Sequence, residues 1–205
     1  MRKCTKPSQY YYLIMNKPRG YVCSAASDSH KTVYELLEPD LQKLVSGAPR
    51  GCRLHTVGRL DCDTSGLLLL TNDGKFSNQI TASGINKTYR ARLAEPVAPE
   101  EQELYISRAA AGLTLPPEKK YGEQKALPAS LIFEAASTCK ITLLEGKFHE
   151  VRRIFRALGN EVTELERIAI GGLELPQDLN PGQWRELSEE EKYTVTLNLF
   201  QGLST

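Results

Sequence analysis

The sequence has 205 residues, of which 40% are apolar and 25% are charged, and its formal net charge is +1. These values predict a folded globular protein, because a disordered chain has lower hydrophobicity and higher net charge. Apolar runs such as 67–70 are far shorter than the roughly 20 residues that cross a bilayer. The first residues also lack the apolar core of a signal peptide.

The five cysteines include no C-x-x-C pair. This pattern argues against a disulfide framework and against a four-cysteine zinc site, and it favours a reducing, cytoplasmic location. Charge is unevenly distributed along the chain. Residues 1–60 carry ten Lys or Arg against four acids, whereas residues 168–205 carry two against six. A basic half permits a polyanionic partner, but a solvated surface explains it equally well.

The first half of the chain predicts mainly strands and tight turns. Aromatic and branched residues precede the Lys17-Pro18-Arg19-Gly20 turn, and four consecutive leucines predict a fully buried strand. The elements expected here are strands at 10–16 and 21–24, a short capped helix at 32–37, strands at 53–57 and 67–71, and a helix at 76–82.

The second half contains the clearest helix of the chain. Val151, Ile154, Phe155 and Leu158 form an apolar stripe at helical spacing, and Gly159 supplies a stop. The elements expected here are a strand at 88–93, a helix at 99–110 with Leu104 facing inward, strands at 130–135 and 140–144, a helix at 148–158, and strands at 161–170 and 184–187. Because strands and helices do not alternate regularly, the sequence predicts an α+β fold with a largely antiparallel mixed sheet.

The segment from Arg59 to Gly66 (R-L-D-C-D-T-S-G) is the densest group of chemistry-bearing residues. It matches the start of a calcium-binding loop, but Asn72 stands where that loop needs a bidentate Glu. A structural turn, in which Asp and Ser satisfy backbone donors, remains an alternative. A functional interpretation is that Arg59 helps to keep the Asp61 carboxylate ionised, as a nucleophile or an electrostatic stabiliser requires.

Two further clusters follow. The E-G-K-F-H-E-V-R-R segment leads into the amphipathic helix, and its basic side chains are either a solvated face or contacts for phosphates and a carboxylate. On the strand at 88–93, Lys87, Tyr89 and Ala91 share one face. Tyr89 is either a core residue or a ring on which an RNA base stacks.

These three clusters, together with Asn16-Lys17-Pro18-Arg19-Gly20, resemble the RsuA-like family of ribosomal RNA pseudouridine synthases over about residues 11–187. The resemblance implies a pseudouridine synthase fold of two lobes with flanking helices and a central RNA cleft. It also implies isomerisation of a ribosomal RNA uridine without a metal or an organic cofactor. By position, Asp61 matches the catalytic aspartate, Tyr89 the active-site tyrosine and Arg152 the arginine paired with the aspartate. The expected RNA-binding residues are Lys17, Arg19, Arg59, Lys87, Lys147, His149, Arg153 and Arg156.

The chain departs from the family pattern at two places. Glu150 stands where the family often has Gln, which alters a backbone or RNA contact but leaves the arginines in place. Only about ten residues precede the match, so we expect one catalytic domain over 1–205 without the small RNA-binding S4 domain. The expected partner is ribosomal RNA, and we expect a monomer that binds no membrane. A non-catalytic RNA-binding module on the same fold and an aspartate-dependent glycosidase remain the alternatives.

Overall fold

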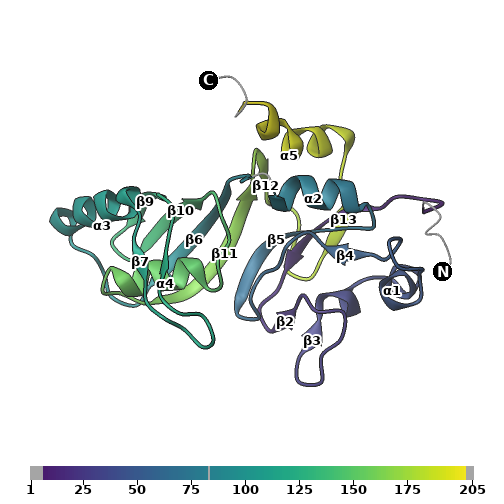
Figure 1. The fold of residues 1–205 in the computed structure, drawn as a ribbon, viewed down its shortest axis with the longest axis horizontal. Helices are drawn as coiled ribbons and strands as arrows, with labels where there is room; N and C mark the ends of the chain where they lie inside the picture. The colour runs from purple at the N-terminus through teal and green to yellow at the C-terminus, as the bar shows by residue number, and fades with distance from the viewer. Residues whose placement is uncertain (1–6, 83, 202–205) are drawn as a thin grey trace. The chain divides into compact units, whose positions relative to one another are not determined.

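The computed structural model describes residues 7–82 and 84–201, and the chain divides into two compact units. Unit 1 comprises residues 1–85 and 169–205, and unit 2 comprises residues 86–168. The chain returns to unit 1 through strand β11 (Val162–Ile170). Each unit combines strands with helices that do not alternate regularly (Figure 1), which confirms the predicted α+β class.

The central strands of unit 1 are buried on both faces. β1 (Tyr12–Lys17) runs antiparallel to β5 (Thr64–Thr71), with Ile14 opposite Leu69. Residues 13–15 and 67–70 are all 0% exposed, so the predicted buried strand is confirmed. β1 also pairs with β13 (Trp184–Glu186), and β5 pairs with β4 (His55–Thr56).

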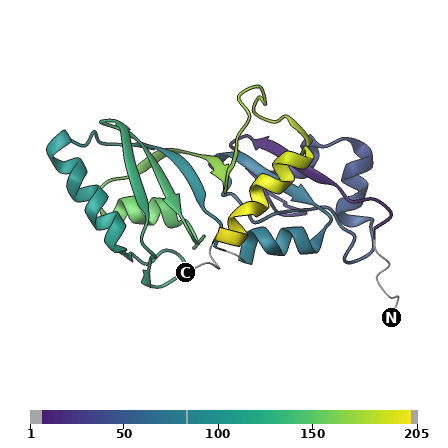
Figure 2. The ribbon, with the colours of Figure 1, turned by 90° about the horizontal axis from the view of Figure 1, so that it is seen from above.

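Helices α2 (Gly74–Ala82) and α5 (Glu189–Gln201) lie side by side in unit 1 (Figure 2). Phe76 and Ile80 of α2 and Val195 of α5 pack with Ile14 and Leu69 in one apolar core. β12 (Leu173–Glu174) pairs with the last residues of β11 and adds Leu173 to the same core. This core fixes β1 and β5, from which the candidate site residues of unit 1 extend.

The segment between β1 and β4 differs most from the sequence-based expectation. The predicted return strand at 21–24 is wrong, because β2 (Tyr21–Val22) pairs in parallel with β3 (Lys31–Thr32). The capping box of Thr32 and Glu35 is formed, but it opens a 3-10 helix, η1 (Val33–Leu36). Helix α1 (Pro39–Ser46), with Leu41 and Val45 buried, was not predicted.

In unit 2 the strand order is β11, β6 (Lys87–Leu93), β10 (Thr138–Leu143) and β9 (Ser130–Ala135). β6 alternates as predicted, because Tyr89, Ala91 and Leu93 are buried whereas Arg90 and Arg92 are exposed. β10 is antiparallel to both β6 and β9. The sheet of unit 2 therefore has one apolar face and one polar face.

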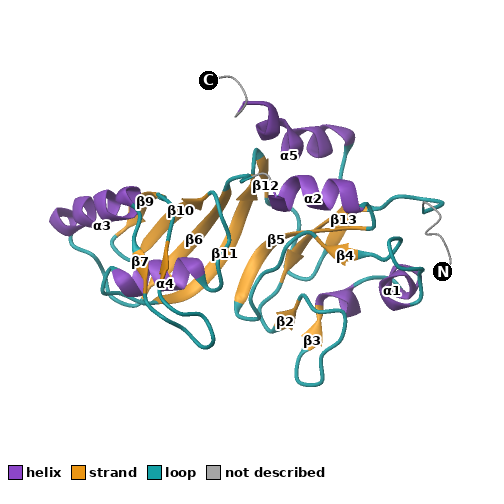
Figure 3. Ribbon diagram, in the orientation of Figure 1, coloured by secondary structure: helices purple, strands orange, loops and turns teal. Residues whose placement is uncertain are grey.

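Helices pack on the strands of unit 2 (Figure 3). α3 (Pro99–Ala111) lies on β9, where the ring of Tyr105 meets Phe133 edge-on at 6.1 Å between centroids. Leu104 is 56% exposed, so the expectation that it faces inward is wrong. α4 (Glu150–Ala157) packs on β7 (Thr114–Leu115), which forms a hairpin with β8 (Gln124–Lys125).

Among the described residues, we find no helix whose length and apolar character would let it span a bilayer.

Candidate active site

Asp61 lies in unit 1, in the turn that precedes β5. The side chain of Lys17 binds main-chain oxygens of this turn. The Lys17 ammonium donates to the main-chain oxygens of Asp61 at 3.0 Å and Thr64 at 2.7 Å. The turn is closed by a bond from the Thr64 N–H to the Asp61 oxygen at 3.1 Å, and the Gly20 N–H donates to the Cys62 oxygen at 2.7 Å. Two motifs 44 residues apart in sequence therefore form one rigid structure.

Lys17 is 0% exposed, and burial lowers the pKa of its ammonium. Its ammonium also donates to the Pro18 oxygen at 3.1 Å. A side chain with no exposed surface cannot reach a phosphate, so the expectation that Lys17 binds RNA is wrong. Its role in this structure is to satisfy carbonyls beneath the Asp61 turn.

The other basic residues of this region remain accessible. Arg19 and Arg59 are both exposed. Of the two carboxylates of the turn, Asp63 is exposed and Asp61 is half-buried. A half-buried carboxylate on a fixed turn, with arginines nearby in the sequence, suits a group that must act on a charged ligand. Within residues 7–82 and 84–201, no three His, Cys, Asp or Glu side chains cluster so as to hold a metal ion.

Tyr89 and Lys87 lie on β6 in unit 2. Tyr89 is 9% exposed and stands opposite Ile141 of β10, on the apolar face of the sheet. Lys87 is half-buried, and its pKa is lowered by desolvation and by the charge of Arg167, against an opposing effect of Glu150. The start of β6 therefore carries an aromatic ring and a desolvated ammonium on one face.

Arg167 is a buried cation that the sequence analysis did not single out. It lies on β11, is 2% exposed, and acts electrostatically on Lys87. Leu165 and Arg167 are two residues apart on one strand and are both buried. Strand alternation after an inward-facing leucine was the signal that could have found Arg167.

The apolar stripe of α4 is confirmed, because Val151, Ile154 and Phe155 are buried. Arg152 is half-buried, and its Nη1 donates to the Val162 oxygen of β11 at 2.7 Å. The side chain of Arg156 is 44% exposed. Of these two arginines, Arg152 is the one fixed by the main chain of a neighbouring strand.

Arg153 is 0% exposed, and its guanidinium is bound by neutral oxygens of unit 2. Nε donates to the Pro116 oxygen at 2.9 Å, Nη2 to the Gly122 oxygen at 2.9 Å and Nη1 to Oε1 of Gln124 at 2.7 Å. The expectation that Arg153 binds RNA is therefore wrong. Its donors hold the loop at 116–123 instead.

The turn before α4 contains two carboxylates in different states. Glu145 accepts from the Leu127 N–H at 2.7 Å and from the Lys147 ammonium. Glu150 is 4% exposed and accepts from the Lys147 N–H at 2.8 Å. Burial, reinforced by a hydrogen bond to Glu145, raises the pKa of Glu150 to about 7. Glu150 is thus substantially protonated near neutral pH, where it resembles the Gln that the family often has.

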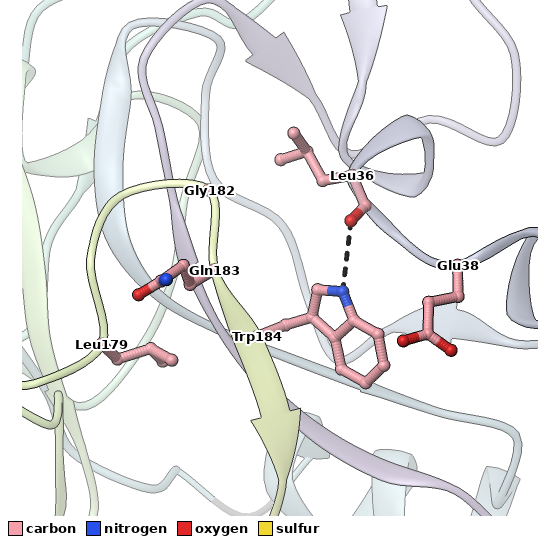
Figure 4. Close-up of a pocket in the computed structure, with 6 residues that line it drawn as sticks. All are labelled: Leu36, Glu38, Leu179, Gly182, Gln183 and Trp184. Atoms are coloured by element: carbon pink, nitrogen blue, oxygen red, sulfur yellow. Dashed lines mark hydrogen bonds between the residues drawn. The ribbon is translucent and has the colours of Figure 1, made fainter.

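A depression of about 480 Å³ in unit 1 contains none of the predicted site residues. It is lined by residues of the β13 region and of the segment before α1: Leu36, Glu38, Leu179, Gly182, Gln183 and Trp184 (Figure 4). Nε1 of Trp184 donates to the Leu36 oxygen at 3.1 Å, which fixes the indole at the edge of the depression.

Comparison with known proteins places these motifs in a family. The family model described as RNA pseudouridylate synthase matches residues 11–157. The ribosomal small subunit pseudouridine synthase A of Escherichia coli K12 is 41% identical over 186 residues, covering 90% of this chain and 73% of the relative. The protein of the same name from Vibrio vulnificus is 39% identical over 184 residues, covering 88% and 72%.

Solved structures agree. A crystal structure of a pseudouridylate synthase superposes with a TM-score of 0.78 at 36% identity, covering 91% of this chain and 74% of that one. The Cbf5-Nop10-Gar1 complex matches at a TM-score of 0.54 and 16% identity, covering 83% of this chain and 52% of that one, which shows the fold alone. The predicted pseudouridine synthase fold and the resemblance to RsuA-like enzymes are confirmed. The chain belongs to the RNA pseudouridylate synthase family of isomerases.

Proposed function

We propose that this protein converts a uridine of small-subunit ribosomal RNA into pseudouridine, with Asp61 as the essential carboxylate. The names of the relatives that are about 40% identical support the substrate class. The observation that carries the proposal is the Asp61 turn, in which a fully buried Lys17 binds the main-chain oxygens of Asp61 and Thr64 and so fixes the turn that bears a half-buried carboxylate.

The proposed reaction breaks the bond between N1 of uracil and C1′ of the ribose, turns the base, and joins C5 to C1′. The proton at C5 is lost and N1 gains one, so that the atoms balance. The detached uracil has to be kept from bulk water during this step. The target uridine must also leave its stack, which costs a few kcal/mol. A fixed carboxylate beside the ribose and a lining ring for the base meet these needs.

We assign Asp61 to the reacting sugar or base, Tyr89 to the wall beside the uracil, and Arg152 to the role of the arginine that keeps the catalytic carboxylate ionised. An arginine paired with a carboxylate favours its ionised form. Tyr89 exposes little of its ring, which suits a wall residue better than an open stacking surface. The bond from Arg152 to the Val162 oxygen restricts the guanidinium and supports a positioning role.

The contacts to the RNA backbone are assigned to the accessible basic residues. They are Arg19 and Arg59 in unit 1 and Lys87, Lys147, His149 and Arg156 in unit 2. Lys17 and Arg153 are excluded from this set because they are 0% exposed. We further propose that the protein acts as a monomer in the cytoplasm.

The test is Asp61→Asn, with Asp63→Asn as the matched control in the same turn. Each protein is incubated with transcripts of small-subunit ribosomal RNA, and pseudouridine is mapped by nucleotide analysis. We expect Asp61→Asn to lower turnover by about a thousandfold or more, as loss of an essential catalytic group does. Asp63→Asn is expected to retain activity, because that side chain is exposed.

Three other results would contradict the proposal. Full turnover by Asp61→Asn would show that Asp61 is not the catalytic group. Tight RNA binding by the wild-type protein with no pseudouridine in any transcript would identify a non-catalytic RNA-binding module. Release of free uracil would identify a glycosidase.

A further inference from the structure

The loop at 116–123, between β7 and β8 of unit 2, is held by its own main-chain hydrogen bonds and by side chains of the unit. Glu118 and Tyr121 exchange two main-chain hydrogen bonds, of 2.8 and 3.0 Å, across a tight turn. Lys119, inside this turn, has a left-handed φ of 53°, which a residue with a side chain rarely adopts. The loop therefore has one specific conformation rather than many.

The buried side chain of Arg153 stabilises that conformation by hydrogen bonds to the loop. Its three nitrogens reach Pro116, Gly122 and Gln124, which lie at both ends of the loop. A guanidinium suits this task because its donors form a rigid planar fork. Burying a cation is costly unless its donors are satisfied, so the loop and the guanidinium stabilise each other.

The ordered loop presents an aromatic stack. The Tyr121 ring stacks on Phe148 with 4.6 Å between centroids and 20° between planes. Phe148 stacks in turn on His149, at 3.8 Å and 17°. The three side chains are partly exposed. Phe148 is thus the ring that both Tyr121 and His149 contact.

Positive charge surrounds this stack. The ammonium of Lys120 lies over the Tyr121 ring and that of Lys119 over the Phe148 ring, each 5.5 Å from the centroid. Both lysines are exposed, so both are available to an anionic partner at the surface of the loop.

The Glu118 carboxylate of the loop is bound by two side chains of the same unit. Glu118 accepts from Nδ1 of His149 at 2.8 Å and from Nη1 of Arg156 at 3.3 Å. Desolvation raises the pKa of Glu118, but the bond from His149 and the charge of Arg156 outweigh it, so that the pKa is lowered. The carboxylate thus stays ionised and bound to His149 and Arg156, and Lys119 and Lys120 dominate the charge of the loop tip.

We propose that the Tyr121 ring stacks on an unpaired base of the substrate RNA, in place of the Lys120 ammonium, with Lys119 and Lys120 on the adjacent phosphates. This inference rests on the proposed function. When one uridine is extruded from its stack, the bases beside it lose a neighbour. A preformed aromatic ring with flanking cations is the usual way in which proteins hold single-stranded bases. Because the loop is already ordered, binding requires little further loss of conformational entropy.

The test compares Tyr121→Leu with Tyr121→Phe, which keeps the ring. The probe is a uridine-containing fragment of small-subunit ribosomal RNA with 2-aminopurine beside the uridine, and Asp61→Asn protein is used so that binding is read without turnover. We expect Tyr121→Leu to weaken binding about tenfold, as loss of one base stack does, and to remove the quenching of 2-aminopurine fluorescence. Tyr121→Phe is expected to bind and quench as the parent protein does.

Replacement of both lysines by Gln tests the phosphate contacts while the stack stays intact. The slope of log affinity against log salt is expected to fall by about 0.7 for each phosphate of single-stranded RNA that a lysine no longer neutralises. In the active protein the same double variant is expected to raise KM and leave kcat unchanged.

Hydrogen exchange over 116–123 separates a binding role from a purely structural one. Equal RNA affinity for Tyr121→Leu and Tyr121→Phe, with the loop still protected, would overturn the inference. If Tyr121→Leu loses loop protection, the test rests on the variant with both lysines replaced by Gln. An unchanged slope of its log affinity against log salt would then overturn the inference. Pseudouridine formation by the wild-type protein together with either of these results would reject only the stacking site, whereas no pseudouridine at all would reject the proposed function.

Discussion

Lys17 in unit 1 and Arg153 in unit 2 are both fully buried cations, yet they organise their surroundings differently. The Lys17 ammonium bonds to carbonyls of two short segments, the turn at 61–64 and its own neighbour Pro18. The Arg153 guanidinium instead spans the two ends of an exposed loop. A compact ammonium suits converging carbonyls, whereas a planar fork suits oxygens that lie further apart.

This contrast shows why the charge of a residue is a poor guide to its exposure. Both residues belong to basic sequence motifs that suggest contacts with phosphate, and both are 0% exposed. In each unit the buried cation bonds to main-chain oxygens of a segment that we propose contacts the RNA. In both motifs, therefore, the buried cation shapes the neighbouring segment and is not itself exposed.

The largest effect is expected for Lys17→Met. The substitution keeps an unbranched chain but leaves several buried carbonyls without a donor, which destabilises a protein by about 3–5 kcal/mol. Chemical denaturation followed by Trp184, the only tryptophan of the sequence, measures this in unit 1. Lys43→Met is the control, because its side chain is 75% exposed and we expect a change within about 0.5 kcal/mol. Equal effects of the two substitutions would contradict the structural role of Lys17.

Arg153→Lys is expected to be milder, by about 2 kcal/mol, because the charge stays but one nitrogen cannot reach three separated acceptors. Amide hydrogen exchange should rise mainly over 116–123, where the acceptors lie. Arg92→Lys serves as the control in the same unit, with a side chain that is 63% exposed. An Arg153→Lys protein with unchanged exchange in this loop would show that the guanidinium fork is dispensable.

The smallest effect is expected for Glu150→Gln, and it depends on pH. Because burial and Glu145 raise the pKa of Glu150 from 4.5 to about 7, the folded protein keeps a proton that the unfolded chain has released. Stability is therefore lost as the pH rises through this window. The substituted amide stays neutral, so we expect little change near pH 5 and a gain in stability that grows as the pH rises toward 8.

Thermal unfolding of both proteins across this pH range measures the difference, with Glu103→Gln on the exposed side of α3 as the control. A difference between Glu150→Gln and the wild-type protein that does not vary with pH would show that Glu150 titrates as an exposed glutamate does.

Local patterns in the sequence predicted much of the fold. The four leucines at 67–70 and the stripe of α4 are determined by their own spacing, and both are confirmed. Helix α1 was missed although Pro39 begins it and Leu41 and Val45 have helical spacing, so its signal was present. The partner of β2 could not be inferred in this way, because alternation does not identify the neighbouring strand.

The errors at single residues have non-local causes. Arg153 lies beside the apolar stripe of α4, and it is buried because the loop at 116–123 covers it. Leu104 was expected inside, but α3 packs on β9 through Tyr105, and Leu104 lies on another flank of the helix. The three clusters assigned to the active site were found from the sequence, whereas Arg167 and the Tyr121 stack were found only in the structure.

The anchoring of Gly20 to Cys62 and of Lys17 to Asp61 has a consequence for protein engineering. The segment between residues 20 and 61 therefore forms a loop whose two ends are held together by these hydrogen bonds. Its tip at 24–30 is exposed throughout, and the entropy of closing a loop grows only slowly with its length. New sequences can therefore be grafted into that tip while the Asp61 carboxylate keeps its position.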